Sequence, residues 1–247
     1  MRPATIRIIR GTGWTFIWLG VYLMGFVAYQ LWFTNLLTAR DQASLADGLD
    51  AHYEEVMVEE VEYVPVVIPG ATTTTVPDTG PIPDPVPKIL LVESDSEVGE
   101  GFGQIRIPVI DLDVTMVEGV RRRDLKTGPG HLTGTPLPGQ PGNAVVSGHR
   151  TTYGAPFGDL GELAVGDRIE VETAIGVHVY EVREAPERCR TDEGLCVVRP
   201  TDLWVTEPRE GSWLTLTTCH PKFSARRRLI VFAELVAGPN AEVILGT

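Results

Sequence analysis

The chain has 247 residues, which fits one medium domain with attachments, and 43% hydrophobic residues, as is usual for a folded protein. Its formal net charge of -12 arises in one segment, because residues 41–100 hold fourteen acidic side chains against one basic side chain, Lys88. The rest of the chain is close to neutral and carries no basic stripe, which argues against a nucleic-acid-binding protein.

An uncharged apolar stretch, residues 13–33, is long enough to cross the hydrocarbon core of a bilayer as a helix. Three arginines precede it within residues 1–12, so the positive-inside rule predicts a cytoplasmic N-terminus and an exported remainder. The alternative is a cleaved signal peptide, but its apolar core would be shorter, and no small-residue cleavage site follows Trp32. We therefore predict an uncleaved, single-pass membrane anchor with the folded domain outside the cell.

Residues 34–100 are predicted to connect this anchor to the folded domain. Leucines at helical spacing in residues 34–49 predict a juxtamembrane helix. Valines and glutamates are interspersed in residues 54–68, and residues 69–87 are rich in Thr, Pro, Asp and Gly. Such a composition buries too little apolar surface to offset the entropy lost on ordering, and prolines favour extended backbone. We interpret the segment as an extended acidic stalk.

From Gly103 onward, short apolar runs alternate with turn residues. The pattern predicts strands over 105–110, 114–117, 144–147, 168–172, 177–182, 213–218 and 229–236. Phe157, Leu160 and Leu163 recur at a spacing that predicts one short helix or 3₁₀ turn. Crossover helices are missing, so an all-β closed antiparallel barrel or sandwich is favoured over a parallel α/β fold. The domain is predicted to cover residues 101–238, with a tail over 239–247.

Cys219 ends one of these predicted strands, immediately before His220-Pro221, where the chain must turn. A thiol nucleophile needs a proton donor for the leaving amine and positive charge or N–H groups for the oxyanion. His149 follows another strand end, and Arg228 begins the last strand. If the strands of Cys219 and Arg228 are antiparallel neighbours, the two residues face each other. The sequence therefore predicts a catalytic group of Cys219, His149 and Arg228.

The other two cysteines, Cys189 and Cys196, lie in one loop-like stretch, residues 187–198. Their separation of seven positions can close a small disulfide ring in an oxidising compartment. Two unpaired loop thiols are the alternative.

Three stretches resemble the sortase family of cysteine transpeptidases. They are residues 128–157, which include Gly148-His149-Arg150 and Tyr153, then Thr215-Leu-Thr-Thr218-Cys219, and Arg228-Leu-Ile-Val. The membrane anchor and the Thr-Leu-Thr-Thr-Cys form are most similar to class E, the housekeeping group of high-GC Gram-positive bacteria. The resemblance covers residues 103–236 and implies a closed eight-stranded sortase-type β-barrel with one or two short helices. It implies thioester-forming transpeptidation. We expect no cofactor and no metal, since no carboxylate cluster of the kind that binds calcium in some sortases is evident in the sequence.

Carried onto this chain, the resemblance implies that Cys219 attacks the Thr–Gly bond of an LPxTG-like or LAxTG-like sorting signal. His149 would protonate the leaving glycine amine and later deprotonate the incoming amine. Arg228 would hold the substrate or the oxyanion, with Arg226 and Arg227 as rivals for that role. The implied partners are surface proteins that carry a C-terminal sorting signal and an amine acceptor in the cell wall.

Three further residues are candidates for contacting substrate or oxyanion: Thr218, Tyr153 and His131. For His131, stabilisation of a turn is the alternative. Residues 187–198 form an elaborated loop in the region that shapes the family's substrate groove, so substrate preference stays open. Val76–Gly80 reads Val-Pro-Asp-Thr-Gly and could act as a tethered pseudo-substrate, although a tract rich in Pro, Thr and Gly produces such a match by chance.

Two other functions fit parts of the pattern. A cysteine peptidase or hydrolase acting at the cell surface is one, but papain-like enzymes place Cys before His in the chain, whereas His149 precedes Cys219. The L,D-transpeptidases carry a Ser-x-Gly-Cys-type motif, which the residues around Cys219 do not match. The second is a non-catalytic surface interaction domain.

Overall fold

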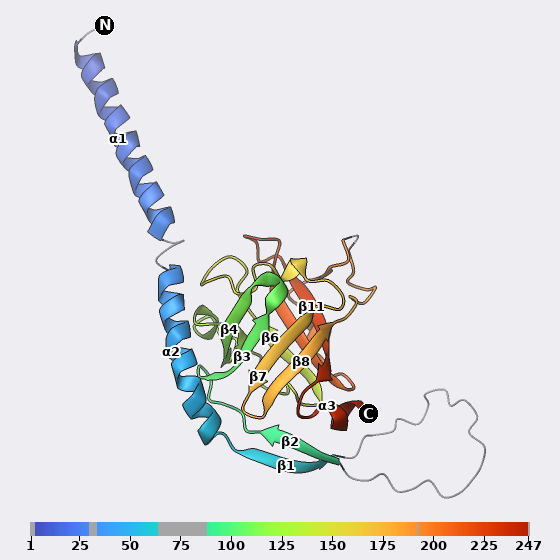
Figure 1. Cartoon of the computed structure of the whole chain (residues 1–247). Helices are drawn as coiled ribbons and strands as arrows, with labels where there is room; N and C mark the ends of the chain where they lie inside the picture. Colours follow the sequence, from blue (N-terminus) through green and yellow to red (C-terminus); the bar gives the residue numbers. More distant parts are fainter. Residues whose placement is uncertain (1–2, 30–33, 64–87, 192, 247) are drawn as a thin grey trace, which may run out of the picture.

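A computed structural model describes residues 3–29, 34–63, 88–191 and 193–246. Helix α1 (Pro3–Ala28) projects away from the rest of the chain (Figure 1). Over Arg10–Ala28 it is long and apolar enough to cross a membrane, and these residues are exposed in the structure. This stretch coincides with most of the predicted anchor, whose last residues, 30–33, lie outside the described part of the chain.

Eight strands form a closed barrel, as predicted (Figure 1). They follow one another in the order β10-β6-β5-β4-β3-β7-β8-β11, and pairing of β10 with β11 closes the circle. The strands are β3 (Gly101–Ile107), β4 (Leu112–Glu118), β5 (Gly130–His131), β6 (Gly142–Ser147), β7 (Arg168–Thr173), β8 (Gly176–Val182), β10 (Ser212–His220) and β11 (Arg227–Ala237). The expectation of a wholly antiparallel barrel was wrong, because β4 pairs with β5, and β6 with β10, in parallel. The parallel β6–β10 pairing needs a long connection. Residues 183–211 provide it, because they lead the chain from the end of β8 back to the opposite end of the barrel, where β10 begins.

Alternating residues of the strands fill the interior of the barrel, as the period of two requires. The inward side chains are fully or almost fully buried, and they include Ile105, Ile107, Ile169, Val171, Tyr180, Leu214, Leu216 and Leu229. Burial of each large aliphatic side chain stabilises the fold by about 1.5–3 kcal/mol relative to an exposed position. The predicted strand at 105–110 ends early, because Pro108 starts the 3₁₀ turn η2 (Pro108–Ile110).

The connection 183–211 covers the outer face of β10 and β11 with a second apolar cluster. It contains β9 (Cys196–Val198), which pairs with the first part of β11, and the 3₁₀ turn η5 (Leu203–Thr206). The cluster consists of Cys189, Cys196, Val198, Val205, Ile230 and Phe232. In the described part of the chain, further 3₁₀ turns are η3 (Asp124–Lys126) and η4 (Leu160–Glu162), the latter within the predicted short helix or turn.

Among the described residues before the barrel, a helix covers the predicted range 34–49, and a strand pair that was not predicted follows it. Helix α2 (Thr34–Glu55) lies alongside the barrel, next to β3 and β4, and strands β1 (Val58–Tyr63) and β2 (Lys88–Glu93) form an antiparallel hairpin beyond it (Figure 1). Leu49 and Leu90 are buried in these contacts, so the segment buries more surface than its acidic composition indicates. The possible pseudo-substrate Val76–Gly80 lies outside the described residues. The predicted C-terminal tail contains a short helix, α3 (Ala241–Leu245).

Candidate active site

Cys219 lies near the end of β10, on the outer face of the barrel. Leu214 and Leu216 of the same strand point into the core, so the alternation of the strand turns Thr215, Thr217 and Cys219 outward. Cys219 is partly exposed and forms no disulfide. A thiol with this exposure is accessible to a substrate, unlike a cysteine buried as a small hydrophobic residue.

His149 reaches the same region because β6 runs parallel to β10. The pairing ends with Ser147 opposite Thr217. His149 and Cys219 each follow these paired residues by two positions, on neighbouring strands that run in the same direction. The Gly148 N–H donates to the Thr217 carbonyl at 3.0 Å, and the Thr218 hydroxyl donates to the Gly148 carbonyl at 2.8 Å. These bonds hold the start of the His149 loop against the strand that carries the thiol.

Residue 148 must be glycine in this arrangement. A Cβ atom there would lie 2.5 Å from the ring of Phe157, which is completely buried under the loop. The Phe157 N–H in turn donates to the His149 carbonyl at 3.0 Å. The loop of residues 149–157 is therefore closed at its base by a hydrogen bond and by ring packing.

The imidazole of His149 has an unused nitrogen. Its Nε2 atom is buried and has no hydrogen-bond partner among the described residues. Burial, reinforced by the positive charge of Arg122, lowers the pKa of His149 below its usual value, and the ring packs against Tyr153 with 5.0 Å between centroids. Unpaired buried polar atoms are rare and need an explanation, and a proton donor or acceptor that awaits a substrate provides one.

Arg228 is the residue of β11 directly opposite Cys219. Residues that face each other across two strands project to the same side of a sheet, so Arg228 shares the outer face with the thiol. Arg227 faces His220 instead and therefore projects to the other side, and Arg226 precedes the strand. The guanidinium of Arg228 donates to the carbonyls of Ala225 and Arg227 at 3.0 and 3.1 Å, leaving other N–H groups for a ligand.

The guanidinium of Arg150, which contacts the backbone of Cys219, was missed by the sequence reasoning. Its Nη1 donates to the Cys219 carbonyl at 3.2 Å and to Nδ1 of His220 at 2.7 Å. Burial lowers the pKa of Arg150, and the negative charge of Asp159 opposes this shift. Burial followed by the charge of Arg150 also lowers the pKa of His220, which suits a neutral ring that accepts from the guanidinium. Arg150 follows His149 directly, but an arginine at a turn gives no signal of what it will contact.

The lower-ranked candidates have different surroundings. Tyr153 packs on His149, and the Nζ atom of Lys126 lies 5.7 Å from the centre of the tyrosine ring. The Thr218 side chain is buried, and its hydroxyl is used in the bond to Gly148. These two residues therefore border the site, one through its ring and the other through its backbone.

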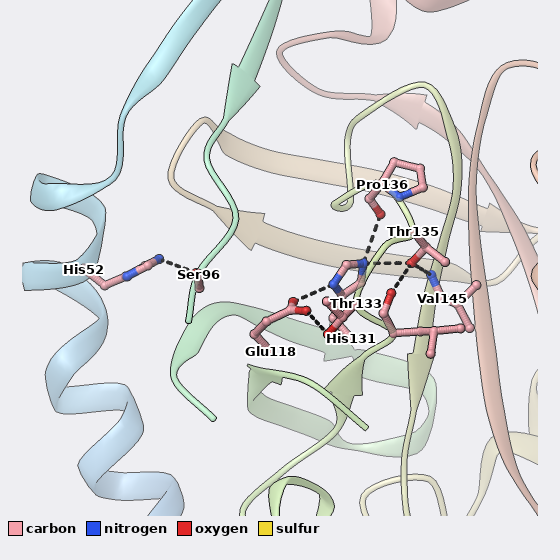
Figure 2. A network of polar contacts seen from close by, with 9 residues as sticks. His52, Ser96, Glu118, His131, Thr133, Thr135, Pro136 and Val145 are labelled. Carbon is pink, nitrogen blue, oxygen red and sulfur yellow. Dashed lines mark hydrogen bonds and ion pairs between the residues drawn. The ribbon is translucent and has the colours of Figure 1, made fainter. Parts of the chain in front are cut away.

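His131 is not brought to the thiol; it lies in a buried polar network (Figure 2). Its Nδ1 atom is 2.6 Å from a carboxylate oxygen of Glu118, and its Nε2 atom is 2.9 Å from the Thr135 hydroxyl and 3.1 Å from the Pro136 carbonyl. The hydroxyl of Thr133 donates to the other oxygen of Glu118 at 2.5 Å. With both ring nitrogens engaged and 1% of its surface exposed, His131 fits the alternative of a turn-stabilising residue.

Cys189 and Cys196 are joined by a disulfide, with 4.7 Å between their Cα atoms. Both are buried in the second apolar cluster, and Cys196 begins β9. Val198 of β9 pairs with Arg228, so the disulfide ring and the predicted active-site arginine share one strand pairing.

Comparison with known proteins gives one consistent family. Residues 105–236 match the sortase domain family. Sortase SrtE1 of Streptomyces coelicolor is 28% identical over 248 residues, an alignment that covers 94% of this chain and 58% of that protein. Sortase D of Bacillus subtilis is 32% identical over 144 residues, covering 57% of this chain and 66% of that protein. The chain thus spans less than two thirds of the length of these two relatives.

Solved structures agree. The structure of sortase E from Streptomyces avermitilis superposes with a TM-score of 0.50 at 33% identity, covering 59% of this chain and 99% of that one. SrtF sortase from Corynebacterium diphtheriae gives a TM-score of 0.51 at 36% identity, covering 58% and 88%. The family match extends over more than half of the chain and over all eight barrel strands in part or whole, and the predicted likeness to class E is confirmed by the sortase E relatives. The chain therefore belongs to the sortase family.

Proposed function

We propose that this chain is a membrane-anchored cysteine transpeptidase that cleaves an LPxTG-like or LAxTG-like sorting signal between Thr and Gly and transfers the new Thr end to an amine of the cell wall. The observation that carries the proposal is the shared position of a partly exposed free thiol, Cys219, an arginine on the same sheet face, Arg228, and a buried imidazole nitrogen without a partner, that of His149.

The chemistry follows from these groups. The Cys219 thiol passes its proton to His149 as the sulfur adds to the threonine carbonyl carbon, and Arg228 stabilises the negative oxygen that forms. The C–N bond to glycine then breaks, and His149 gives its proton to the departing amine, which leaves a thioester on Cys219. The acceptor amine attacks the thioester, its proton passes to His149, and the thiolate departs with the new amide formed.

The N-terminal part supports a location at the membrane. Helix α1 provides the apolar length, and arginines lie on its N-terminal side. By the positive-inside rule the N-terminus is cytoplasmic and the barrel extracellular, where the disulfide is stable. Surface proteins with a sorting signal and a wall precursor or peptidoglycan amine would both be present there.

The direct test is intact mass spectrometry of the full chain in detergent, incubated with a Leu-Ala-x-Thr-Gly or Leu-Pro-x-Thr-Gly peptide with and without an amine. We expect a covalent adduct on Cys219 that is smaller than the peptide by the glycine fragment, and an amide product when amine is present. Free threonine acid as the sole product would instead assign a hydrolase, and no adduct with either peptide would favour an interaction domain.

The matched control is Cys219→Ala. We expect it to abolish the adduct entirely while the melting temperature changes by no more than about 2 °C, because the side chain is partly exposed and forms no disulfide. Retention of the adduct in this variant would show that another residue is the nucleophile.

A further inference from the structure

Helix α2 docks on the barrel through one stripe of residues spaced three and four apart. The stripe consists of Asn35, Thr38, Gln42, Leu45 and Leu49. Such spacing places all five on one face of a helix. Leu36 and Leu37, which lie off this stripe, are exposed. The docking face is therefore polar toward the start of the helix and apolar toward its end.

Gln42 fixes the helix to an open strand edge. Because β5 pairs only with Val117 and Glu118 of β4, the backbone of Thr115 on that edge has no strand partner. The Gln42 amide takes the place of one: its Oε1 accepts from the Thr115 N–H at 2.8 Å, and its Nε2 donates to the Thr115 carbonyl at 2.9 Å and to the Thr127 carbonyl at 2.7 Å. A Cβ at Gly128 would lie 2.4 Å from Gln42 Nε2, so glycine there makes room for the amide.

The first turn of the stripe reaches the loop that follows His149. The Gly154 N–H donates to Asn35 Oδ1 at 3.1 Å. The Thr38 methyl lies 3.5 Å from where a Gly154 Cβ would be. Around these contacts a cavity of about 510 Å³ separates α2 from the loop, lined by both. The Asn35 side chain thus bridges the helix and the Gly154 backbone at the border of this cavity.

The loop needs such support because its backbone is in an unfavourable conformation. Tyr153 and Ala155, on either side of Gly154, have φ angles of 52° and 47°, in the left-handed region that side chains with a Cβ disfavour. Tyr153 is also the residue whose ring packs on His149. Release of Gly154 would let both neighbours relax, and the ring against His149 would move with them.

We propose that Asn35, on the helix that follows the membrane anchor, is a positioning residue for His149, acting through Gly154 and Tyr153. The inference rests on the proposed role of His149 and extends it, because it makes the juxtamembrane helix part of the catalytic apparatus. Chain length also limits how far the site can lie from α1. Asn35 is seven positions after Ala28, which corresponds to at most about 25 Å of extended chain.

The test compares three variants of the full chain in nanodiscs. Asn35→Ala removes the acceptor, Asn35→Asp keeps an oxygen that can accept from Gly154, and Leu36→Ala is a control at the exposed adjacent position. Hydrogen exchange of the 150–158 segment and an NMR titration of isotope-labelled histidine, with His149 assigned by a His149→Gln variant, require no substrate. Transfer kinetics with a sorting peptide give kcat and KM.

For Asn35→Ala we expect loss of protection at Gly154 and a rise in the pKa of His149 toward its usual value, since an opened loop admits water to the ring. We expect a fall in kcat of about fivefold, with KM changed less than about twofold, because a misplaced proton donor slows the chemical step. Asn35→Asp should restore protection and most of kcat, and Leu36→Ala should match the unmodified chain.

Unchanged exchange and an unchanged His149 titration in Asn35→Ala would overturn the inference. So would lost protection with the same titration and the same kcat, which would reduce the contact to a structural one. If the unmodified chain forms no amide at all, the proposed function fails, while exchange and titration still decide whether Asn35 controls the surroundings of His149.

Discussion

The arginines at the start of β11 show how strand register places adjacent residues of the same chemistry on opposite faces of a sheet. Arg226, Arg227 and Arg228 are consecutive, and each carries the same guanidinium. The antiparallel register places Arg228 opposite Cys219 and Arg227 opposite His220, on the reverse face. Distance along the chain is thus less important than the side of the sheet to which each residue projects.

This difference gives a prediction for a matched pair of variants. Arg228→Gln should lower kcat/KM by about a hundredfold, the usual effect of removing one oxyanion-stabilising group, whereas Arg227→Gln should stay within about threefold. The measurement is transfer of a sorting peptide to an amine, with melting curves to verify folding. Equal losses in both variants would contradict the assignment by register.

On the scale of elements, the connection 183–211 matters to the site because it packs against the strand that carries Arg228. Its disulfide closes a short ring, and β9, which begins inside that ring, pairs with the segment of β11 that carries Arg228. The second apolar cluster, which includes Ile230 and Phe232, covers the outer face of β11. The loop therefore influences the site through a strand that it holds in place.

Replacing both Cys189 and Cys196 by serine should lower the free energy of unfolding by about 2–3 kcal/mol, the loop-closure term for a ring of this size. Activity should fall as well, because β9 would be less firmly paired beside Arg228. Chemical denaturation with and without reductant checks this: reductant should destabilise the unmodified chain to the level of the double variant and leave the variant unchanged. An unaffected midpoint in both proteins would show that the ring adds no stability.

Across the whole molecule, the two ends of the barrel have different partners. The end with Cys219 and His149 contacts the first turn of α2, and the opposite end is covered by β2 and α3. There the amide of Asn240 accepts from the Leu91 N–H at 2.9 Å and donates to the Leu91 carbonyl at 2.8 Å, so it binds β2 much as another strand would. Glu93, the last residue of β2, is buried, and its Oε1 has no hydrogen-bond partner among the described residues.

Burial raises the pKa of Glu93 from 4.5 to about 7. The folded protein therefore retains a proton that the unfolded chain has released between these pH values, and stability should fall as pH rises from about 4.5 to about 7. Glu93→Gln removes this ionisation and should stabilise the chain above pH 7 by up to about 3 kcal/mol, with little effect below pH 4.5. Thermal unfolding across this range is the measurement, and Glu60→Gln on the exposed β1 is the control. The prediction would be refuted if the stability of the Glu93→Gln variant and that of the unmodified chain changed with pH in parallel.

Much of the barrel was predictable because short apolar runs and the turn residues between them mark its strands in the local sequence. Seven of its strands were placed within a few residues by apolar runs and turn residues, and Cys219 and His149 were singled out because each follows such a run. The eighth strand, β5, has two residues and no periodicity to detect. The contacts of Arg150 and Asn35 could not be predicted, because their partners are backbone carbonyl and N–H groups far away in the chain.

The stalk differs from its prediction in one described part, the strand pair of β1 and β2 that follows the predicted helix. The helix itself was predicted, but its docking was not, because Gln42 binds backbone groups that the short β5 leaves without a strand partner. The sequence by itself determined the apolar N-terminal helix, most of the strands and the candidate thiol, since hydrophobic length and period two are local properties. The tertiary structure alone decided which arginine lies opposite Cys219 and which helix contacts the loop after His149, since both depend on register and on open hydrogen-bonding groups between distant segments.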